Sequence, residues 1–125
     1  MGLKMVVADD REVVRTGLAS LLKGSDIEIV GEAANGVEAV EKYKELKPGL
    51  TTMDIVMPFK SGIEATKEIL SSNKDAVVVM CSALGQESLV MEAIEAGAAD
   101  FVVKPFKPED VLRVVQKVLA GHAGA

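Results

Sequence analysis

Short runs of β-branched and other apolar residues alternate along the chain with longer stretches in which apolar residues recur every three or four positions. Runs of the first kind are typical of buried strands, and stretches of the second kind predict helices with one buried face. Each predicted strand is followed by one predicted helix, so the pattern indicates five strand–helix units. The strands are expected at residues 5–8, 28–31, 50–53, 77–80 and 101–103.

Glycine, proline and asparagine agree with this alternation. Gly24 and Gly97 stand where helices should end, Asn35-Gly36 and residues 47–49 are expected to form turns, and Pro108 suits the first position of a helix. The first, fourth and fifth strand runs are almost continuously apolar, which predicts strands covered on both faces. The sequence therefore predicts an α/β protein with a parallel sheet between two layers of helices.

Length and composition bound the function. The chain has 125 residues, of which 49% are apolar and 26% are charged, as in an ordinary globular domain. We expect one domain over residues 1–120 and a flexible tail over 121–125. Nineteen acidic against fourteen basic residues give a net charge of −5, which argues against nucleic-acid binding by this segment.

Nothing in the chain predicts a membrane span or a signal peptide, because no apolar run is long enough and the N-terminus leads directly into a strand pattern. We therefore expect a cytoplasmic protein without membrane contact. The single cysteine, Cys81, agrees with a reducing compartment and is expected to be a core residue.

Polar residues follow four of the five predicted strands. Asp9 and Asp10 come after the first strand, Asp54 after the third, Ser82 after the fourth and Lys104 after the fifth. Right-handed crossovers place the carboxyl ends of all parallel strands at one edge of the sheet, where ligands of such folds bind. Each residue alone could be a helix cap or a loop residue, but caps do not explain the joint pattern. We therefore expect these five side chains to converge.

Three adjacent carboxylates need a neutralising partner. Two unit charges 4 Å apart repel by roughly 1 kcal/mol in water and by about 4 kcal/mol at an effective dielectric constant near 20. Either the carboxyl pKa values rise or a cation binds, and an all-oxygen cluster suits Mg²⁺. One Mg²⁺ together with Lys104 would balance the charges of Asp9, Asp10 and Asp54, so the site is expected to be neutral only with the metal bound.

Five motifs occur in an order and spacing that resemble bacterial two-component response-regulator receiver domains of the CheY-like kind. The similarity spans residues 3–120 and implies a flavodoxin-like (βα)₅ fold with strand order 2-1-3-4-5. The motifs are Asp9-Asp10, residues 53–58 with Gly62, residues 81–83, residues 97–101 and residues 104–106.

The resemblance implies a role for each acidic residue. Asp54 would be the phosphoacceptor, attacking a phosphohistidine on a sensor histidine kinase or phosphotransfer protein. Asp10, Asp54 and the backbone carbonyl of Val56 would ligate Mg²⁺, with Asp9 acting mainly through water. Lys104 would neutralise charge on the transferred group. Such a protein promotes its own phosphorylation and dephosphorylation but is primarily a signalling switch, which leaves its status as an enzyme open.

The resemblance also implies a switch and an output surface. Ser82 would hydrogen-bond a phosphoryl oxygen, and the aromatic ring of Phe101 would turn inward with that movement. The Lys104–Pro105 peptide bond would be cis. A downstream effector, such as the flagellar motor switch, would bind the face formed by residues 84–96 and 103–111.

Alternatives remain open at this point. Residues 13–36 are similar to receivers attached to DNA-binding transcription factors, whereas the chain from Thr52 onward resembles the single-domain chemotaxis regulators. The chain could therefore be a receiver domain from a longer transcriptional regulator. A flavodoxin-like module for a small ligand is a remote alternative, because two acids stand where its phosphate loop would be. A hydrolase with an aspartyl nucleophile would need an Asp-x-Asp arrangement after the first strand, whereas Asp9 and Asp10 are adjacent.

Overall fold

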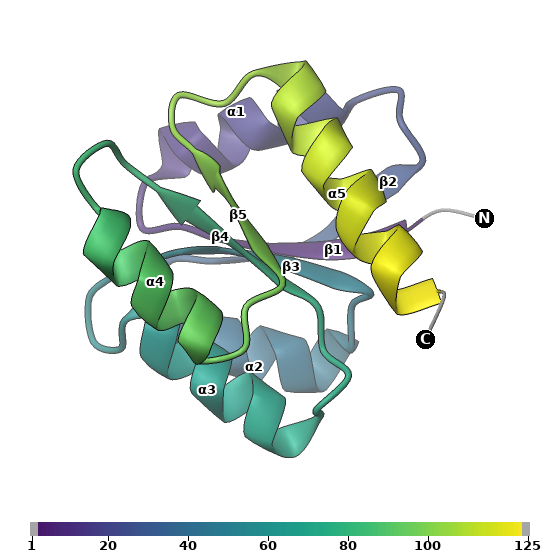
Figure 1. Ribbon diagram of the computed structural model, residues 1–125. Coiled ribbons are helices and arrows are strands. Elements are labelled where there is room, and N and C mark those ends of the chain that lie inside the picture. The colour runs from purple at the N-terminus through teal and green to yellow at the C-terminus, as the bar shows by residue number, and fades with distance from the viewer. Residues whose placement is uncertain (1–2, 124–125) are drawn as a thin grey trace.

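The computed structural model describes residues 3–123, and the side-chain surroundings through residue 118. Its centre is one sheet of five parallel strands in the order β2-β1-β3-β4-β5, as expected for a flavodoxin-like fold (Figure 1). The strands are β1 (Leu3–Ala8), β2 (Ile27–Ala33), β3 (Leu50–Asp54), β4 (Val78–Ser82) and β5 (Asp100–Val103).

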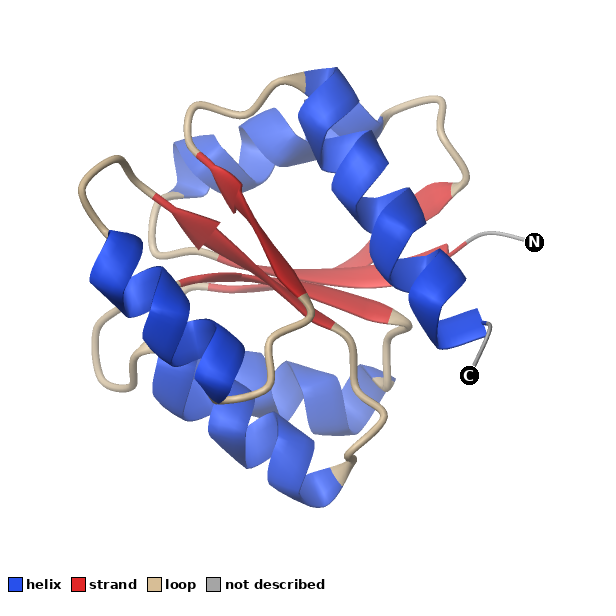
Figure 2. Cartoon of the chain, in the orientation of Figure 1, coloured by secondary structure: helices blue, strands red, loops and turns tan. Residues whose placement is uncertain are grey.

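Five helices cover the two faces of the sheet, which confirms the predicted alternation. Helices α1 and α5 pack on one face, and α2, α3 and α4 pack on the other (Figures 1 and 2). The helices are α1 (Glu12–Leu22), α2 (Gly36–Leu46), α3 (Gly62–Ser72), α4 (Glu87–Glu95) and α5 (Pro108–Ala123). None of the described helices is long and apolar enough to cross a membrane.

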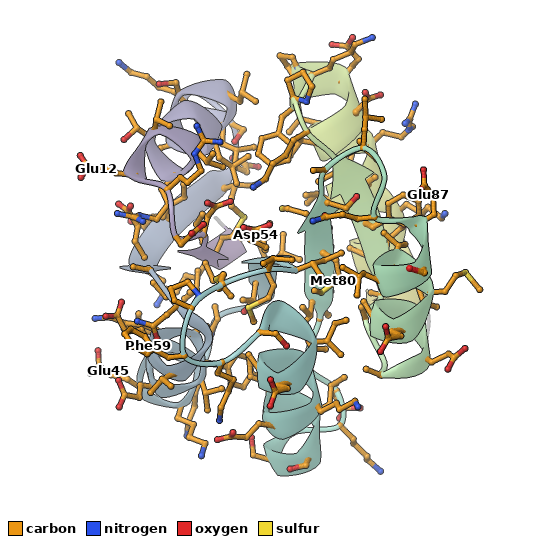
Figure 3. The ribbon with its side chains drawn as sticks, turned by 90° about the vertical axis from the view of Figure 1, so that its left-hand side faces the viewer. Glu12, Glu45, Asp54, Phe59, Met80 and Glu87 are labelled. Atoms are coloured by element: carbon orange, nitrogen blue, oxygen red, sulfur yellow. The ribbon has the colours of Figure 1, made fainter. Side chains whose placement is uncertain are left out.

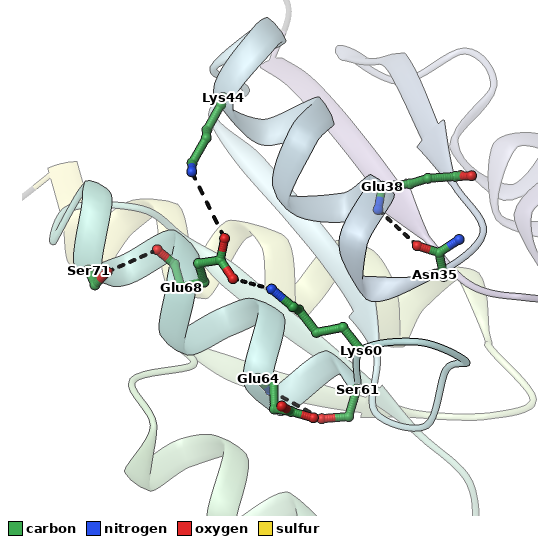
Figure 4. Close-up of polar contacts among 8 residues, drawn as sticks. All are labelled: Asn35, Glu38, Lys44, Lys60, Ser61, Glu64, Glu68 and Ser71. Carbon is green, nitrogen blue, oxygen red and sulfur yellow. Dashed lines mark hydrogen bonds and ion pairs between the residues drawn. The ribbon is translucent and has the colours of Figure 1, made fainter.

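Side-chain caps fix the starts of α2 and α3. The Asn35 side chain accepts a hydrogen bond from the Glu38 N–H at 2.9 Å, and Ser61 accepts one from the Glu64 N–H at 3.2 Å (Figure 4). These bonds satisfy amide groups that have no partner within the helix. Asn35-Gly36 was expected to form a turn, but it is the cap and first residue of α2.

The central strands β1, β3 and β4 are buried on both faces over most of their length. The expectation that β5 is covered on both faces was wrong: it lies at the edge of the sheet, and Phe101 and Val103 are exposed. Met53 and Met80 belong to the core under α2, α3 and α4, whereas Met5 and Leu50 belong to the core under α1 and α5. Cys81 lies in this second core, 4% exposed, as expected for a structural cysteine.

Several boundaries differ from the sequence-based expectation. Asp54 and Ser82 are the last residues of β3 and β4 rather than residues that follow the strands, because the strand pairing continues through both. Helix α5 continues to Ala123 and so includes residues 121–123. The flexibility expected for the tail over residues 121–125 stays a prediction. Residues 124–125 lie outside the described part.

Candidate functional site

The carboxyl ends of the strands bring the predicted site residues to one edge of the sheet. Asp54 pairs with Cys81 in the strand register, and Ser82 pairs with Val103, so the ends of β3, β4 and β5 lie side by side. Figure 3 views the side of the molecule where these strands end, and Asp54 lies near its middle. The topology therefore places the ends of these strands together at one edge of the sheet, as the sequence predicted.

The three aspartates form one cluster. Oxygen atoms of Asp9, Asp10 and Asp54 lie within 4.8 Å of one another. Asp9 is 2% exposed and Asp54 is 7% exposed, whereas Asp10 is open to solvent. Lys104 joins the cluster from the end of β5, with Nζ 2.7 Å from Asp9 Oδ2 and 3.3 Å from Asp54 Oδ1. The ammonium group offsets part of the repulsion among the acids.

Burial and charge change the ionisation of this cluster. Burial, followed by the charge of Asp9, raises the pKa of Asp54 from 3.8 to about 6, although Lys104 opposes the change. For Lys104, burial acts to lower the pKa, but the hydrogen bond to Asp9 and the charges of Asp54 and Asp9 outweigh it, so the pKa is raised. Lysine therefore stays charged, while Asp54 binds its proton more tightly than an exposed carboxyl group does.

Asp9 is fixed by its neighbours, whereas Asp10 is free. Asp9 Oδ1 accepts a hydrogen bond from the Arg11 N–H at 2.9 Å, and its Oδ2 faces Lys104. Among the described residues, Asp10 has no hydrogen-bonded or ionic partner. The available oxygens therefore belong to Asp10 and to Asp54. Hard carboxylate oxygens from two adjacent strand ends, with a third acid behind them, fit the donor preference of Mg²⁺.

The loop after Asp54 is held close to the strand end. The Gly62 N–H donates to the Ile55 carbonyl at 2.8 Å, and a Cβ atom at Gly62 would lie 2.0 Å from the backbone oxygen of Asp54. Only glycine allows α3 to begin this close to the acid. Val56, whose backbone carbonyl is the expected ligand, lies in this loop and is 55% exposed.

Ser82 and Phe101 line the same hollow on the side of α4. Ser82 is 1% exposed at the end of β4, and Phe101 in β5 is 38% exposed rather than part of the core. Met91 of α4 also lines this hollow, which has a volume of about 280 Å³. The serine and the aromatic ring are thus connected by one open space, and the ring has room to change position. The Lys104–Pro105 bond is cis, as the resemblance implied.

One functional candidate was absent from the sequence analysis. Arg15 of α1 donates to the backbone carbonyl of Asp9 at 2.7 Å and pairs with Glu32 of β2. Neither residue directly follows a predicted strand, so the search for polar residues at strand ends did not identify them. A charged residue at position 15, on the mostly apolar side of a helix, was the available signal.

Comparison with known proteins identifies the class of this domain. A family model described as the response regulator receiver domain matches residues 5–116, and the chain belongs to that family. It is 49% identical over 118 residues to the chemotaxis protein CheY of Thermotoga maritima, covering 94% of this chain and 98% of that protein. It is 47% identical over 119 residues to the chemotaxis protein CheY of Bacillus subtilis, covering 95% and 99%.

A solved structure shows the same fold. The CheX–CheY–BeF₃–Mg²⁺ complex from Borrelia burgdorferi contains a chain with a TM-score of 0.88 and 35% identity, and the match covers 94% of this chain and 89% of that one. The recognition of the family and of the flavodoxin-like fold from the five motifs is therefore confirmed.

Proposed function

We propose that this chain is a phosphoacceptor switch of a two-component system, most similar to the single-domain chemotaxis regulators. The observation that carries the proposal is the convergence of three aspartates and Lys104 at one sheet edge, with a free carboxylate on Asp10. The similarity to chemotaxis proteins over nearly the full chain supports the signalling role.

Asp54 is the phosphoacceptor in this proposal. One of its carboxylate oxygens attacks the phosphorus of a phosphohistidine on a sensor histidine kinase or phosphotransfer protein. A P–O bond forms, the P–N bond breaks, and its electron pair stays on the imidazole nitrogen, which takes up a proton. Lys104, already 3.3 Å from Asp54, neutralises charge on the moving phosphoryl oxygens.

Asp10, Asp54 and the Val56 carbonyl would hold Mg²⁺, with Asp9 behind them and bonded to Lys104. When bound, this ion supplies charge neutralisation for the phosphoryl oxygens. Asp9 holds the lysine in place, and burial of Asp54 limits the access of water to its carboxylate.

The output is proposed to pass through Ser82 and Phe101. Ser82 would donate a hydrogen bond to a phosphoryl oxygen on Asp54, and Phe101 would move into the hollow that both residues line. This movement changes the surface formed by α4, β5 and α5. An effector that reads the phosphorylated state, such as a flagellar motor switch protein, would bind there.

The other functions considered have less support. Asp9 and Asp10 stand where a flavin-binding module needs a phosphate loop, and their charges would repel a phosphate. A receiver domain of a longer transcriptional regulator would use the same site chemistry, but no observation favours it over the chemotaxis function.

The test is phosphorylation with acetyl phosphate, a small phosphodonor, followed by intact-mass measurement with Mg²⁺ or with EDTA. We expect one phosphoryl adduct on the parent protein in Mg²⁺, none in EDTA, and none on Asp54→Asn under either condition. Asp75→Asn, at an exposed position after α3, is the control and should be phosphorylated like the parent. An adduct that persists on Asp54→Asn would contradict the assignment of the phosphoacceptor.

A further inference from the structure

The backbone of Asp9 is held on one side by the end of β2 and on the other by Arg15 of α1. Its N–H donates to the carbonyl of Ala33 at 2.9 Å, and its carbonyl accepts from Arg15 Nη1 at 2.7 Å. The same guanidinium group places Nε 2.8 Å from Glu32 Oε1. Arg15 therefore bridges three elements: its own helix α1, the end of β1 and the end of β2.

This bridge differs from an ordinary surface ion pair. The Arg15 side chain is 15% exposed, whereas that of Arg113, which pairs with Asp110 on α5, is 72% exposed. A planar guanidinium holds two acceptors in one fixed geometry, which a lysine cannot do. Because it is enclosed and bonded at both ends, Arg15 is suited to fix the position of the carbonyl that it contacts.

That carbonyl belongs to the peptide unit that joins Asp9 to Asp10. The peptide unit is planar, so a bond to the Asp9 oxygen also fixes the orientation of the Asp10 N–H and Cα. Asp10 has no side-chain partner among the described residues and is repelled by two neighbouring carboxylates. The direction of its side chain thus depends on the backbone that Arg15 restrains.

We infer that Arg15, oriented by Glu32, is a positioning residue that holds Asp10 in place for the divalent cation. The inference rests on the proposed function, since the site it serves is the Mg²⁺ site of the phosphoacceptor. Arg15 itself contacts neither the cation nor the phosphoryl group; it acts through the Asp9 carbonyl.

Charge alone would predict the opposite result. Removing a positive group near an acidic cluster should strengthen cation binding, whereas loss of positioning should weaken it. Glu32 separates the two effects further, because glutamine keeps an oxygen that accepts from Arg15 Nε while removing the negative charge. Alanine removes both the acceptor and the charge.

The experiment measures Mg²⁺ affinity by NMR titration of backbone amides, together with the Mg²⁺ concentration that gives half the maximal rate with acetyl phosphate. We expect Arg15→Met and Arg15→Lys to raise the Kd for Mg²⁺, by about tenfold for Met, as for other residues that orient metal ligands. The phosphorylation rate at saturating Mg²⁺ should be retained. Glu32→Ala should also weaken Mg²⁺ binding, whereas Glu32→Gln should keep the affinity of the parent. Arg113→Met is the matched control and should bind Mg²⁺ like the parent.

Each result decides the question. If both Arg15 variants bind Mg²⁺ like a parent that becomes phosphorylated, the inference is wrong and the proposed function stands. If the parent itself shows neither Mg²⁺ binding nor an adduct, the proposed function is wrong. Binding in Glu32→Gln as weak as in Glu32→Ala would show that charge rather than positioning acts, which also overturns the inference. Circular dichroism in EDTA checks folding, and if Arg15→Met does not fold, Arg15→Lys and the Glu32 pair still give the answer.

Discussion

At the scale of single residues, Asp54 combines burial with a neighbouring carboxylate. Its pKa rises to about 6, so the metal-free protein holds a carboxyl group that is costly to ionise. Lys104 offsets only part of this cost, although it contacts both Asp54 and Asp9. The carboxylates repel one another when no cation is present. A bound cation offsets this repulsion, so the cluster favours cation binding.

This residue should make stability depend on pH. Because the folded chain binds the Asp54 proton more tightly than the unfolded chain, the free energy of unfolding should fall as pH rises from the unfolded pKa of 3.8 to the folded value of about 6. Asp54→Asn should therefore stabilise the metal-free protein by about 1–2 kcal/mol at pH 7, after allowance for solvent screening, and by less near pH 4. Urea denaturation in EDTA at both pH values measures this. A variant no more stable than the parent at pH 7 would contradict the ionisation described here.

At the scale of elements, two glycines clamp the loop between β3 and α3. A Cβ atom at Gly36 would lie 2.1 Å from the Lys60 carbonyl oxygen, and one at Gly62 would lie 2.0 Å from the Asp54 carbonyl oxygen. Both contacts are with backbone, which cannot turn aside as a side chain can. The starts of α2 and α3 therefore hold the segment that carries Asp54 and Val56.

Gly62→Ala should be strongly destabilising. Its methyl group would force α3 away from the end of β3, at a cost of about 2 kcal/mol or more in the free energy of unfolding. Gly17→Ala is the matched control, because that position lies in α1 with nothing within 4 Å of the added atom. The control should stabilise the protein by about 0.5–1 kcal/mol, since alanine favours helix more than glycine does. Thermal and urea denaturation measure both, and equal stability of the two variants would refute the clamp.

At the scale of the whole molecule, the sheet carries the acidic cluster at one edge and a hydrophobic core on each face. The strands that end at Asp54 and Ser82 are buried along their length, so the positions of these side chains are set by the packing of the entire sheet. Binding at the edge is therefore linked to the stability of the fold, because unfolding disperses the three aspartates.

Mg²⁺ should accordingly stabilise the folded chain. A ligand that binds only the folded state adds about 2.7 kcal/mol when its concentration is 100 times its Kd. We expect the Tm of the parent to rise with Mg²⁺ concentration and that of Asp10→Asn to rise much less. Sodium chloride at matched ionic strength is the control. An equal effect of both salts on the parent would show general screening in place of a specific site.

Much of this organisation could be predicted from the sequence. Runs of apolar residues marked most of the buried strands, and the polar residues that follow such runs marked the strand ends. Strand β3 is buried although it contains Thr51 and Thr52. The strand order came from the resemblance, because hydrophobic periodicity does not say which strands are neighbours. The exact strand ends were less accessible: backbone pairing carries β3 through Asp54 and β4 through Ser82 although both side chains are polar.

By itself, the sequence determined the class of fold, the residues of the acidic cluster and the membership of Lys104 in it, since apolar periodicity and the rule for parallel crossovers depend only on residue order. The tertiary structure decided which oxygens of the cluster are occupied and which are free. It also revealed the ion pair between Arg15 and Glu32, which joins α1 to β2. The two residues are distant in sequence, so no local pattern predicts their contact. The physical reason is that hydrogen bonds between distant segments depend on distances of a few ångströms, which only the packed chain defines.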